Sequence, residues 1–119
     1  MFDHVVINTT DYSTSRNFFL QVLEPIGIEL VSEGPLGLEI SADGKTSLCI
    51  RRVEAPSSHL HIAFVAERRE QVDEFYRAAL AFGAKDNGAP GVRSEYSETY
   101  YAAFVIGPDG HNIEMVCHK

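Results

Sequence analysis

The sequence predicts an α+β fold in which two paired βαβββ modules form an open, eight-stranded sheet or barrel that lines a cleft. Three observations support this prediction: the chain has the length of one domain, its second half repeats its first, and alternating apolar stretches flank two stretches with helical spacing. The 119 residues are 45% hydrophobic, enough to close a modest core without disulfide bridges. We therefore expect one domain, residues 1–119, with modules at about 1–55 and 58–119.

Composition and charge argue against several classes of partner. A formal net charge of -7 repels a phosphate backbone, and the basic clusters Arg51-Arg52 and Arg68-Arg69 are too short to form a basic stripe. No apolar stretch approaches the roughly 20 residues that span a bilayer, and the first residues are unlike a signal peptide. The two cysteines, Cys49 and Cys117, fit reduced thiols in a cytosolic chain. We expect a cytoplasmic protein that binds neither nucleic acid nor membrane.

The internal repeat aligns the two modules. His61 follows His4 by 57 positions, and at this offset the strand that begins at His4 matches the strand that begins at His61. A glycine-rich hairpin expected around Gly88 to Gly91 lengthens the second module by eight residues, after which Leu48-Cys49-Ile50 matches Ile113-Glu114-Met115. Cys49 is therefore the repeat counterpart of Glu114.

The first module is expected to contain a strand, a helix and three further strands. The helix begins near Ser13, which we assign as the N-cap, and ends at Pro25 to Gly27, because the apolar residues between them recur at helical spacing. Turn signals at Gly34-Pro35 and Asp43-Gly44 separate the strands that follow. The four strands are expected at residues 4–9, 28–33, 36–41 and 46–53.

The second module repeats this order after a linker at Pro56-Ser57-Ser58. Its helix is expected from about Glu70 to a stop at Gly83, with an inward stripe that includes Leu80. The turn Gly107-Pro108-Asp109-Gly110 separates two apolar strands, and one short strand is expected between the helix and this pair. The four strands are expected near residues 59–65, 84–86, 99–106 and 111–117.

Four side chains are expected to converge where the modules meet. Alternation places His4 and Cys49 on one face of the first module, and His61 and Glu114 on the matching face of the second. A carboxylate in the apolar strand around Glu114 is costly unless a cation or hydrogen bonds compensate, or unless it pairs with Arg51. Two imidazoles and one carboxylate suit Fe(II), Mn(II), Ni(II) or Zn(II) with positions left open for substrate. The pattern predicts a divalent metal site.

The strands that begin at His4 and His61, and the segment Phe104 to Glu114 with its Gly-Pro-Asp-Gly turn followed by Asn-Ile-Glu, resemble the vicinal-oxygen-chelate superfamily of glyoxalases, bleomycin-resistance proteins and extradiol dioxygenases. The resemblance covers nearly the whole chain. It implies βαβββ modules around a divalent metal whose bidentate oxygen ligand is the substrate, with His4, His61 and Glu114 as metal ligands. Such modules pair within a chain or between chains, so we also expect a homodimer.

Two departures from the family pattern bear on the reaction. Glyoxalase I relatives carry a glutamate where this chain has Cys49, so the fourth ligand of the proton-shuttling isomerase is missing. Extradiol dioxygenases use the two-histidine, one-carboxylate set that is kept here, but they carry further acid-base histidines on a longer chain. Bleomycin-binding relatives dispense with the metal, which leaves three retained ligand positions unexplained. The resemblance therefore leaves the reaction type open.

Further side chains are candidates for the substrate and the reaction. Arg51 is expected either to bind a substrate carboxylate or to lie in water at a strand end. Cys49 is expected to contact the substrate or, as a thiolate, to be a fourth ligand to a soft metal; the alternative is that it packs in the core. Arg93 lies in the inserted hairpin, where it covers the site or is solvated. Tyr100 and Tyr101 alternate, so only one faces the cleft; we assign Tyr101, whose hydroxyl would donate to an oxyanion beside the metal.

Two functions follow from these expectations. The first is Lewis-acid catalysis of the lyase or isomerase type, similar to lactoylglutathione lyase, or of the dioxygenase type, on a small substrate that chelates through adjacent oxygens. Glu114 and Tyr101 are its expected catalytic residues. The alternative is a small-molecule binding or drug-sequestering resistance protein without turnover. A third possibility is a structural subunit with a vestigial site. The sequence leaves open whether the protein is an enzyme.

Overall fold

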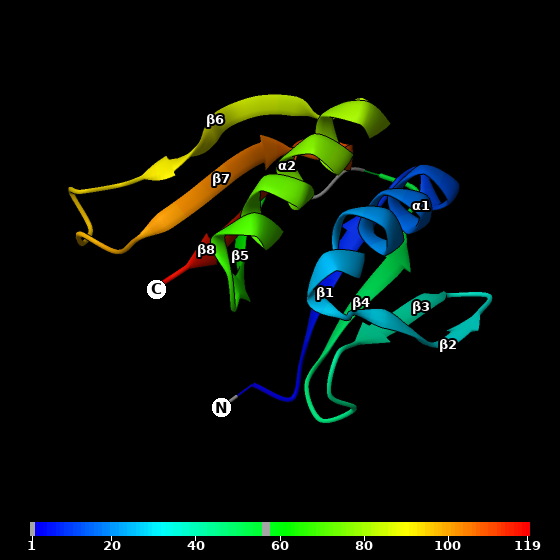
Figure 1. The fold of residues 1–119 in the computed structure, drawn as a ribbon. Helices are drawn as coiled ribbons and strands as arrows, with labels where there is room; N and C mark the ends of the chain where they lie inside the picture. Colours follow the sequence, from blue (N-terminus) through cyan, green and yellow to red (C-terminus); the bar gives the residue numbers. More distant parts are fainter. Residues whose placement is uncertain (1, 56–57) are drawn as a thin grey trace.

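The computed structural model describes residues 2–55 and 58–119, and each half of the chain folds as a βαβββ module (Figure 1). The first module contains β1 (His4–Thr9), α1 (Tyr12–Val22), the short helix η1 (Glu24–Ile26), β2 (Glu29–Gly34), β3 (Gly37–Ser41) and β4 (Ser47–Arg52). The second contains β5 (His61–Ala66), α2 (Arg69–Phe82), β6 (Lys85–Val92), β7 (Tyr101–Ile106), the short helix η2 (Pro108–Gly110) and β8 (Asn112–Cys117). The predicted α+β fold of eight strands is confirmed.

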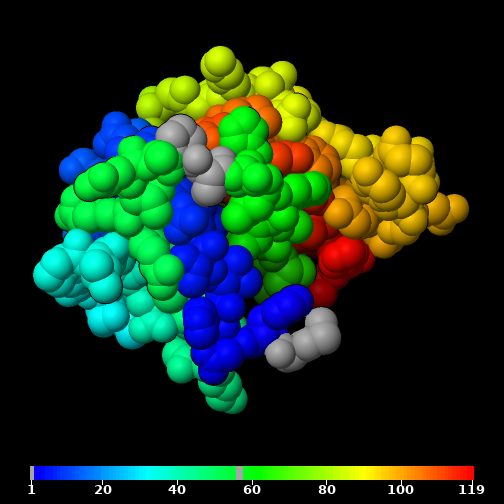
Figure 2. Space-filling view, turned by 180° about the vertical axis from the view of Figure 1, so that it is seen from behind, coloured from blue at the N-terminus to red at the C-terminus, as the bar shows by residue number. Residues whose placement is uncertain are grey.

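The eight strands form two four-stranded sheets with equivalent topology. The orders are β1-β4-β3-β2 and β5-β8-β7-β6, and in each sheet the first strand of the module lies parallel to the last. Each helix covers one face of its own sheet; we call the other face the open face. Seen from behind, the segments of β1 and β5 lie side by side near the middle of the molecule (Figure 2). Among the described residues no helix is long and apolar enough to cross a membrane.

A single core joins the modules through their helices. Phe18 of α1 and Phe75 of α2 are fully buried in one apolar cluster with the inner faces of both sheets. The ring of Phe18 packs edge-on against Phe82 with centroids 5.6 Å apart, and Gln71 Nε2 donates to the Pro25 carbonyl at 2.9 Å. Burying the phenylalanine rings of both helices in one cluster stabilises the helix pair by roughly several kcal/mol. The two halves therefore fold as one unit.

Both helices begin slightly before their predicted starts. The N-cap of α1 is Asp11, whose carboxylate accepts from the Thr14 amide at 3.3 Å, so the assignment of Ser13 was wrong. An ionised carboxylate suits this position as well as a hydroxyl does, and it also favours the positive end of the helix dipole. In α2, Leu80 was expected to point inward, but its side chain is 38% exposed.

The glycine-rich segment of the second module is a strand and not a turn. Gly88 and Gly91 lie inside β6, and the register between β6 and β7 shifts at both of them. Gly88 has φ +147, and a Cβ there would stand 3.0 Å from the Phe104 ring. The glycines therefore mark bulges, and the turn falls at residues 93–100, where the hairpin projects from the body (Figure 1). Of the predicted linker, Pro56-Ser57 lies outside the described residues.

The turn before β8 ties the end of β1 to the second module. The Asp109 carboxylate accepts hydrogen bonds from the Thr10 amide at 2.8 Å and from the Thr10 hydroxyl at 2.6 Å. Beside it, buried His111 accepts from the Leu60 amide at Nδ1, 3.1 Å away, while its Nε2 lies 3.2 Å from the Asn8 carbonyl. These contacts fix the open face of one sheet relative to the other.

Candidate functional site

Glu114 is a buried carboxylate on the open face of the C-terminal sheet. Alternation along β8 turns Ile113 and Met115 into the core and Glu114 to the opposite side, where it is only 2% exposed. Its Oε1 lies 2.8 Å from His61 Nε2, and its Oε2 accepts from the Tyr100 hydroxyl at 2.5 Å. These two hydrogen bonds compensate for the desolvation of the charge.

The strand register explains why these side chains meet. Glu114 pairs with Ala63 of β5 on one side and with Phe104 of β7 on the other. His61 stands one alternation step before Ala63 on the same face, so its ring reaches Glu114 and packs against Phe104 with centroids 6.0 Å apart. We call His61, Tyr100, Phe104 and Glu114 the C-terminal half-site.

Tyr100 is held as a protonated donor. The hydrogen bond to Glu114, together with burial of the ring, raises the pKa of Tyr100 to about 12. Tyr96 and His118 pack against the Tyr100 ring, with centroids 4.9 Å and 5.3 Å away. The hydroxyl is therefore fixed in place and keeps its proton at neutral pH.

The open face of the N-terminal sheet carries a second group of polar side chains. His4, Glu39, Cys49 and Arg51 line a groove of about 390 Å³, and we call these residues the N-terminal half-site. His4 Nδ1 lies 2.7 Å from the Asp3 carboxylate, and its side chain is 53% exposed. The predicted substrate-binding residues Cys49 and Arg51 thus lie beside His4, away from Glu114.

One chain brings two of the three predicted metal ligands together. His61 and Glu114 are in contact, but within residues 2–55 and 58–119 no group of three His, Cys, Asp or Glu side chains has the geometry to hold a metal. The repeat equivalence itself is preserved, because His4 pairs with Ser47 as His61 pairs with Asn112. The four residues expected to converge therefore form two separate pairs, one in each half-site.

Tyr100, and not Tyr101, has its hydroxyl at Glu114 on the open face of the sheet. The Tyr101 hydroxyl donates to Asp73 of α2 at 2.7 Å, and the Arg69 guanidinium lies 4.9 Å from its ring centroid, so Tyr101 faces the helix and the prediction was wrong. Tyr101 shares its face of β7 with Ala103 and Val105, both fully buried. The local sequence does not distinguish the two tyrosines, because Ala102 and Ala103 are both fully buried; the pairing of Phe104 with Glu114 sets which face Tyr100 shares.

Arg93 lies at the edge of the C-terminal half-site. Its guanidinium is 5.4 Å from the Phe104 ring centroid, but its Nη1 donates to the Gly91 carbonyl at 3.0 Å and its Nη2 to the Ala89 carbonyl at 2.7 Å. Arg93 thus braces the bulged part of β6. Its predicted role in substrate binding stays a prediction, as does that of Arg51.

The C-terminal half-site has donors of the type that a divalent metal requires. An imidazole nitrogen and a carboxylate oxygen already lie 2.8 Å apart on one sheet face, and the His61 side chain is 51% exposed, which leaves access for an ion. The pair fits an incomplete first shell, because protein sites for these metals use at least three protein ligands. A metal bound here would need a third donor from outside this half-site.

The fold and the half-sites define the class of protein. The Glyoxalase/Bleomycin resistance protein/Dioxygenase superfamily model matches residues 1–115, and the chain belongs to this superfamily. A search of curated proteins found no match.

Several solved structures have the same fold as this chain. A glyoxalase/bleomycin resistance protein from Albidiferax ferrireducens is 26% identical, covers 98% of both chains and superposes with a TM-score of 0.84. A glyoxalase/bleomycin resistance protein/dioxygenase family enzyme from Burkholderia phytofirmans is 21% identical over 98% of both chains, with a TM-score of 0.79. An oxidase is 16% identical over 98% of this chain and 92% of its own, with a TM-score of 0.74.

Proposed function

We propose that the protein is a metal-dependent enzyme that acts as a Lewis-acid catalyst on a small substrate chelating through two adjacent oxygens. The observation that carries the proposal is the His61–Glu114 pair, because an imidazole and a carboxylate in contact on one open sheet face are ligand types of Fe, Mn, Ni and Zn.

The third ligand in this proposal is His4 of a second copy of the chain. His4 is exposed on the open face of one sheet, and the His61–Glu114 pair is on the open face of the other. A twofold dimer can place the N-terminal half-site of each copy against the C-terminal half-site of the other, which forms two identical sites. Cys49 and Arg51 then approach the substrate from the side opposite Glu114.

The residues of the chain have distinct parts in this reaction. His61, Glu114 and His4 hold the ion, which when bound supplies the Lewis acidity that polarises the substrate oxygens. The Tyr100 hydroxyl donates to one Glu114 oxygen at 2.5 Å, so the other oxygen, which faces His61, is the one that would bind an ion. Arg51 offers a planar, bidentate donor to an anionic substrate group. The two free cysteines support a reducing, cytoplasmic setting.

A second candidate function is binding of a small molecule without turnover. The observation that favours it is that both Glu114 oxygens already have protein donors, and no buried side-chain polar atom of the described residues lacks a partner. The half-site is therefore complete in hydrogen bonds without an ion. Such a protein would sequester its ligand in the groove between two copies.

Metal content of the tag-free protein distinguishes the two functions. We expect about one Fe, Mn, Ni or Zn per chain by elemental analysis, after reconstitution with each ion in turn. His61→Ala, Glu114→Ala and His4→Ala should each lose the ion, whereas the control His59→Ala, outside both half-sites, should keep it. Sedimentation of the same samples reports whether the protein is a dimer.

Each outcome decides between the proposals. Loss of the ion in the His4→Ala variant of a dimeric protein supports a site shared between copies. Retention in His4→Ala with loss in the other two variants removes His4 from the ligand set. No ion in any sample after reconstitution rejects the catalytic proposal and leaves the small-molecule binder.

A further inference from the structure

A cavity of about 390 Å³ lies at the seam between the two modules, apart from both half-sites. Its wall combines apolar side chains of the first module with side chains of β5 from the second. The apolar lining residues are Phe2, Val5, Ile28, Ile40, Leu48, Ile62, Ala63 and Phe64. We call this space the seam cavity. Its volume lies within the range of small-molecule sites, which is about 300–1,000 Å³.

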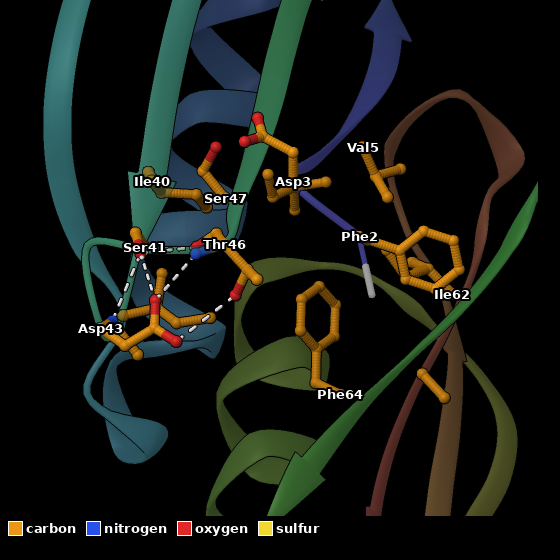
Figure 3. A pocket seen from close by; sticks show the side chains of 14 residues that line it. Phe2, Asp3, Val5, Ile40, Ser41, Asp43, Thr46, Ser47, Ile62 and Phe64 are labelled. Atoms are coloured by element: carbon orange, nitrogen blue, oxygen red, sulfur yellow. Dashed lines mark hydrogen bonds between the residues drawn. The ribbon is translucent and has the colours of Figure 1, made fainter.

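The seam cavity is on the opposite side of β5 from the metal-ligand candidates. Ile62 and Phe64 alternate with His61 and Ala63, so their side chains point away from the open face. Figure 3 shows the side chains of Phe2, Val5 and Phe64 around the same hollow, with Ile62 beside them. Phe2 is 66% exposed at the mouth, where its ring contributes apolar surface that water now covers. A ligand here would not compete with one at Glu114.

One end of the seam cavity is polar, and its groups are acceptors. The Ser41 hydroxyl is already used, because it donates to the Thr46 carbonyl at 2.6 Å. The Asp43 carboxylate accepts from the amides of Lys45 at 2.7 Å and Thr46 at 3.0 Å, and these backbone hydrogen bonds hold the pKa of Asp43 below its usual range. Asp3, at the start of β1, adds a second carboxylate.

The charge of this end is therefore of one sign. Among residues 2–55 and 58–119, the lining contains Asp3 and Asp43 and no lysine, arginine or histidine. Two carboxylates beside an apolar wall attract an ammonium group and repel an anion, and because both carboxylates are exposed, salt weakens these effects.

We propose that the seam cavity is a second binding site, for a small cationic amphiphile whose apolar body fills the space lined by Val5, Ile62 and Phe64 and whose ammonium group faces Asp3 and Asp43. The cavity lies on the other side of β5 from His61 and Glu114, and it is linked to the proposed metal ligands by Asp3, whose carboxylate is 2.7 Å from His4 Nδ1. Binding closes the apolar seam between the modules, and the aliphatic and aromatic walls take a flat or branched hydrocarbon body rather than a polar one.

A pair of probes with the same body and opposite charge tests the site. 1-Naphthylmethylammonium and 1-naphthylacetate share an aromatic body that fits the volume, and they differ in the sign of the head group. We expect the cation to bind at least about 10-fold more tightly by calorimetry at low salt. Nuclear Overhauser effects should connect the naphthyl protons with side chains of Val5, Ile40 and Ile62.

Two variants with matched controls locate the binding. Val5→Phe fills the cavity and should weaken cation binding by about 10-fold or more, whereas Leu36→Phe, at an exposed turn outside the cavity, should leave it unchanged. Asp3→Asn removes one carboxylate and should weaken binding by about 3-fold, whereas Glu74→Gln on α2 should have no effect. Since Asp3 is exposed, its variant keeps the fold even if Val5→Phe does not.

Three results would overturn the proposal. Equal affinity for the two probes would show that the charge of the head group does not affect binding. Contacts of the probe with side chains outside the seam cavity would show that the site is elsewhere. Unchanged affinity of the cation for a folded Val5→Phe protein, or for Asp3→Asn, shows that these residues do not form the site. Because neither probe chelates a metal, the outcome is separate from that of the metal analysis.

Discussion

Glu114 shows how a charged side chain is accommodated in an apolar strand. Its neighbours Ile113 and Met115 are fully buried, yet the carboxylate is stabilised because His61 and Tyr100 each supply a donor. Its repeat counterpart, Cys49, needs no such partners and is half-buried in the groove of the other sheet. Equivalent backbone positions in the two modules therefore carry side chains of different chemistry.

Because of its hydrogen bond to Glu114, Tyr100 is expected to lose its proton at a higher pH than an ordinary tyrosine. With a pKa of about 12 in the folded protein against an ordinary 10.0, protonated Tyr100 contributes stability below pH 10 that is lost as the pH rises toward 12. We expect a pH titration of tyrosinate absorbance to measure this. The curve of Tyr100→Phe, subtracted from that of the wild type, should leave a step centred near pH 12.

Glu114→Gln serves as the control for this titration. Without the carboxylate, the same difference step should move to lower pH, because the main cause of the raised pKa is gone. A step near 10 in the wild type would contradict the hydrogen bond.

At the scale of the element, the start of β3 depends on a glycine. Gly37 has φ +154, and a Cβ there would lie 1.9 Å from the Ile50 carbonyl oxygen of β4. We expect Gly37→Ala to lower the free energy of unfolding by about 3 kcal/mol, because the strand must either separate from β4 or change its backbone angles. Urea denaturation measures the change.

Gly34 provides the matched control at the other end of the same turn. A Cβ at Gly34 meets nothing within 4 Å, so Gly34→Ala should change stability by less than about 1 kcal/mol. Equal effects of the two substitutions would show that β3 tolerates a side chain against β4.

The sequence predicted the elements whose period was regular. β1, β5, β8 and both helices follow from apolar spacing, since each buries one face against the core. β6 was predicted too short, because glycines at 88 and 91 indicate a turn locally, while the pairing with β7 decides that they are bulges. Register is a property of two strands and cannot be seen in the pattern of one.

At the scale of the molecule, the junction between modules is sensitive to acid. Burial acts to raise the pKa of Asp109, but the hydrogen bonds from Thr10 outweigh it and hold that pKa below its usual range. The ionised group therefore contributes stability above about pH 4, which is lost as the pH falls through the folded pKa. We expect Asp109→Asn to lose about 1 kcal/mol at neutral pH and to show a flatter acid limb in denaturation curves.

Glu74→Gln is the control for this acid limb. Glu74 is exposed on α2 and faces neither Thr10 nor His111, so its replacement should leave the acid limb unchanged. An acid limb in Asp109→Asn that is as steep as that of the wild type would show that another carboxylate controls the junction.

The sequence predicted the part of the candidate site that lies within one sheet, but not how the two modules are placed relative to each other. The pairing of His61 with Glu114 follows from alternation and the repeat, because both lie on neighbouring strands of one sheet. Whether His4 joins them depends on how whole modules pack, which is decided by contacts such as Phe18 on Phe82 and Thr10 on Asp109. Such contacts combine residues far apart in the chain, so no local pattern contains them.

The separation of the two half-sites within one chain has a genetic consequence. If each site joins His4 of one copy to Glu114 of another, a mixed dimer of His4→Ala and Glu114→Ala chains has one site with both lesions and one with none. Random exchange of the two inactive proteins should then restore metal binding to about a quarter of all sites. Two recessive alleles of this gene would complement each other, although neither chain alone forms a complete site.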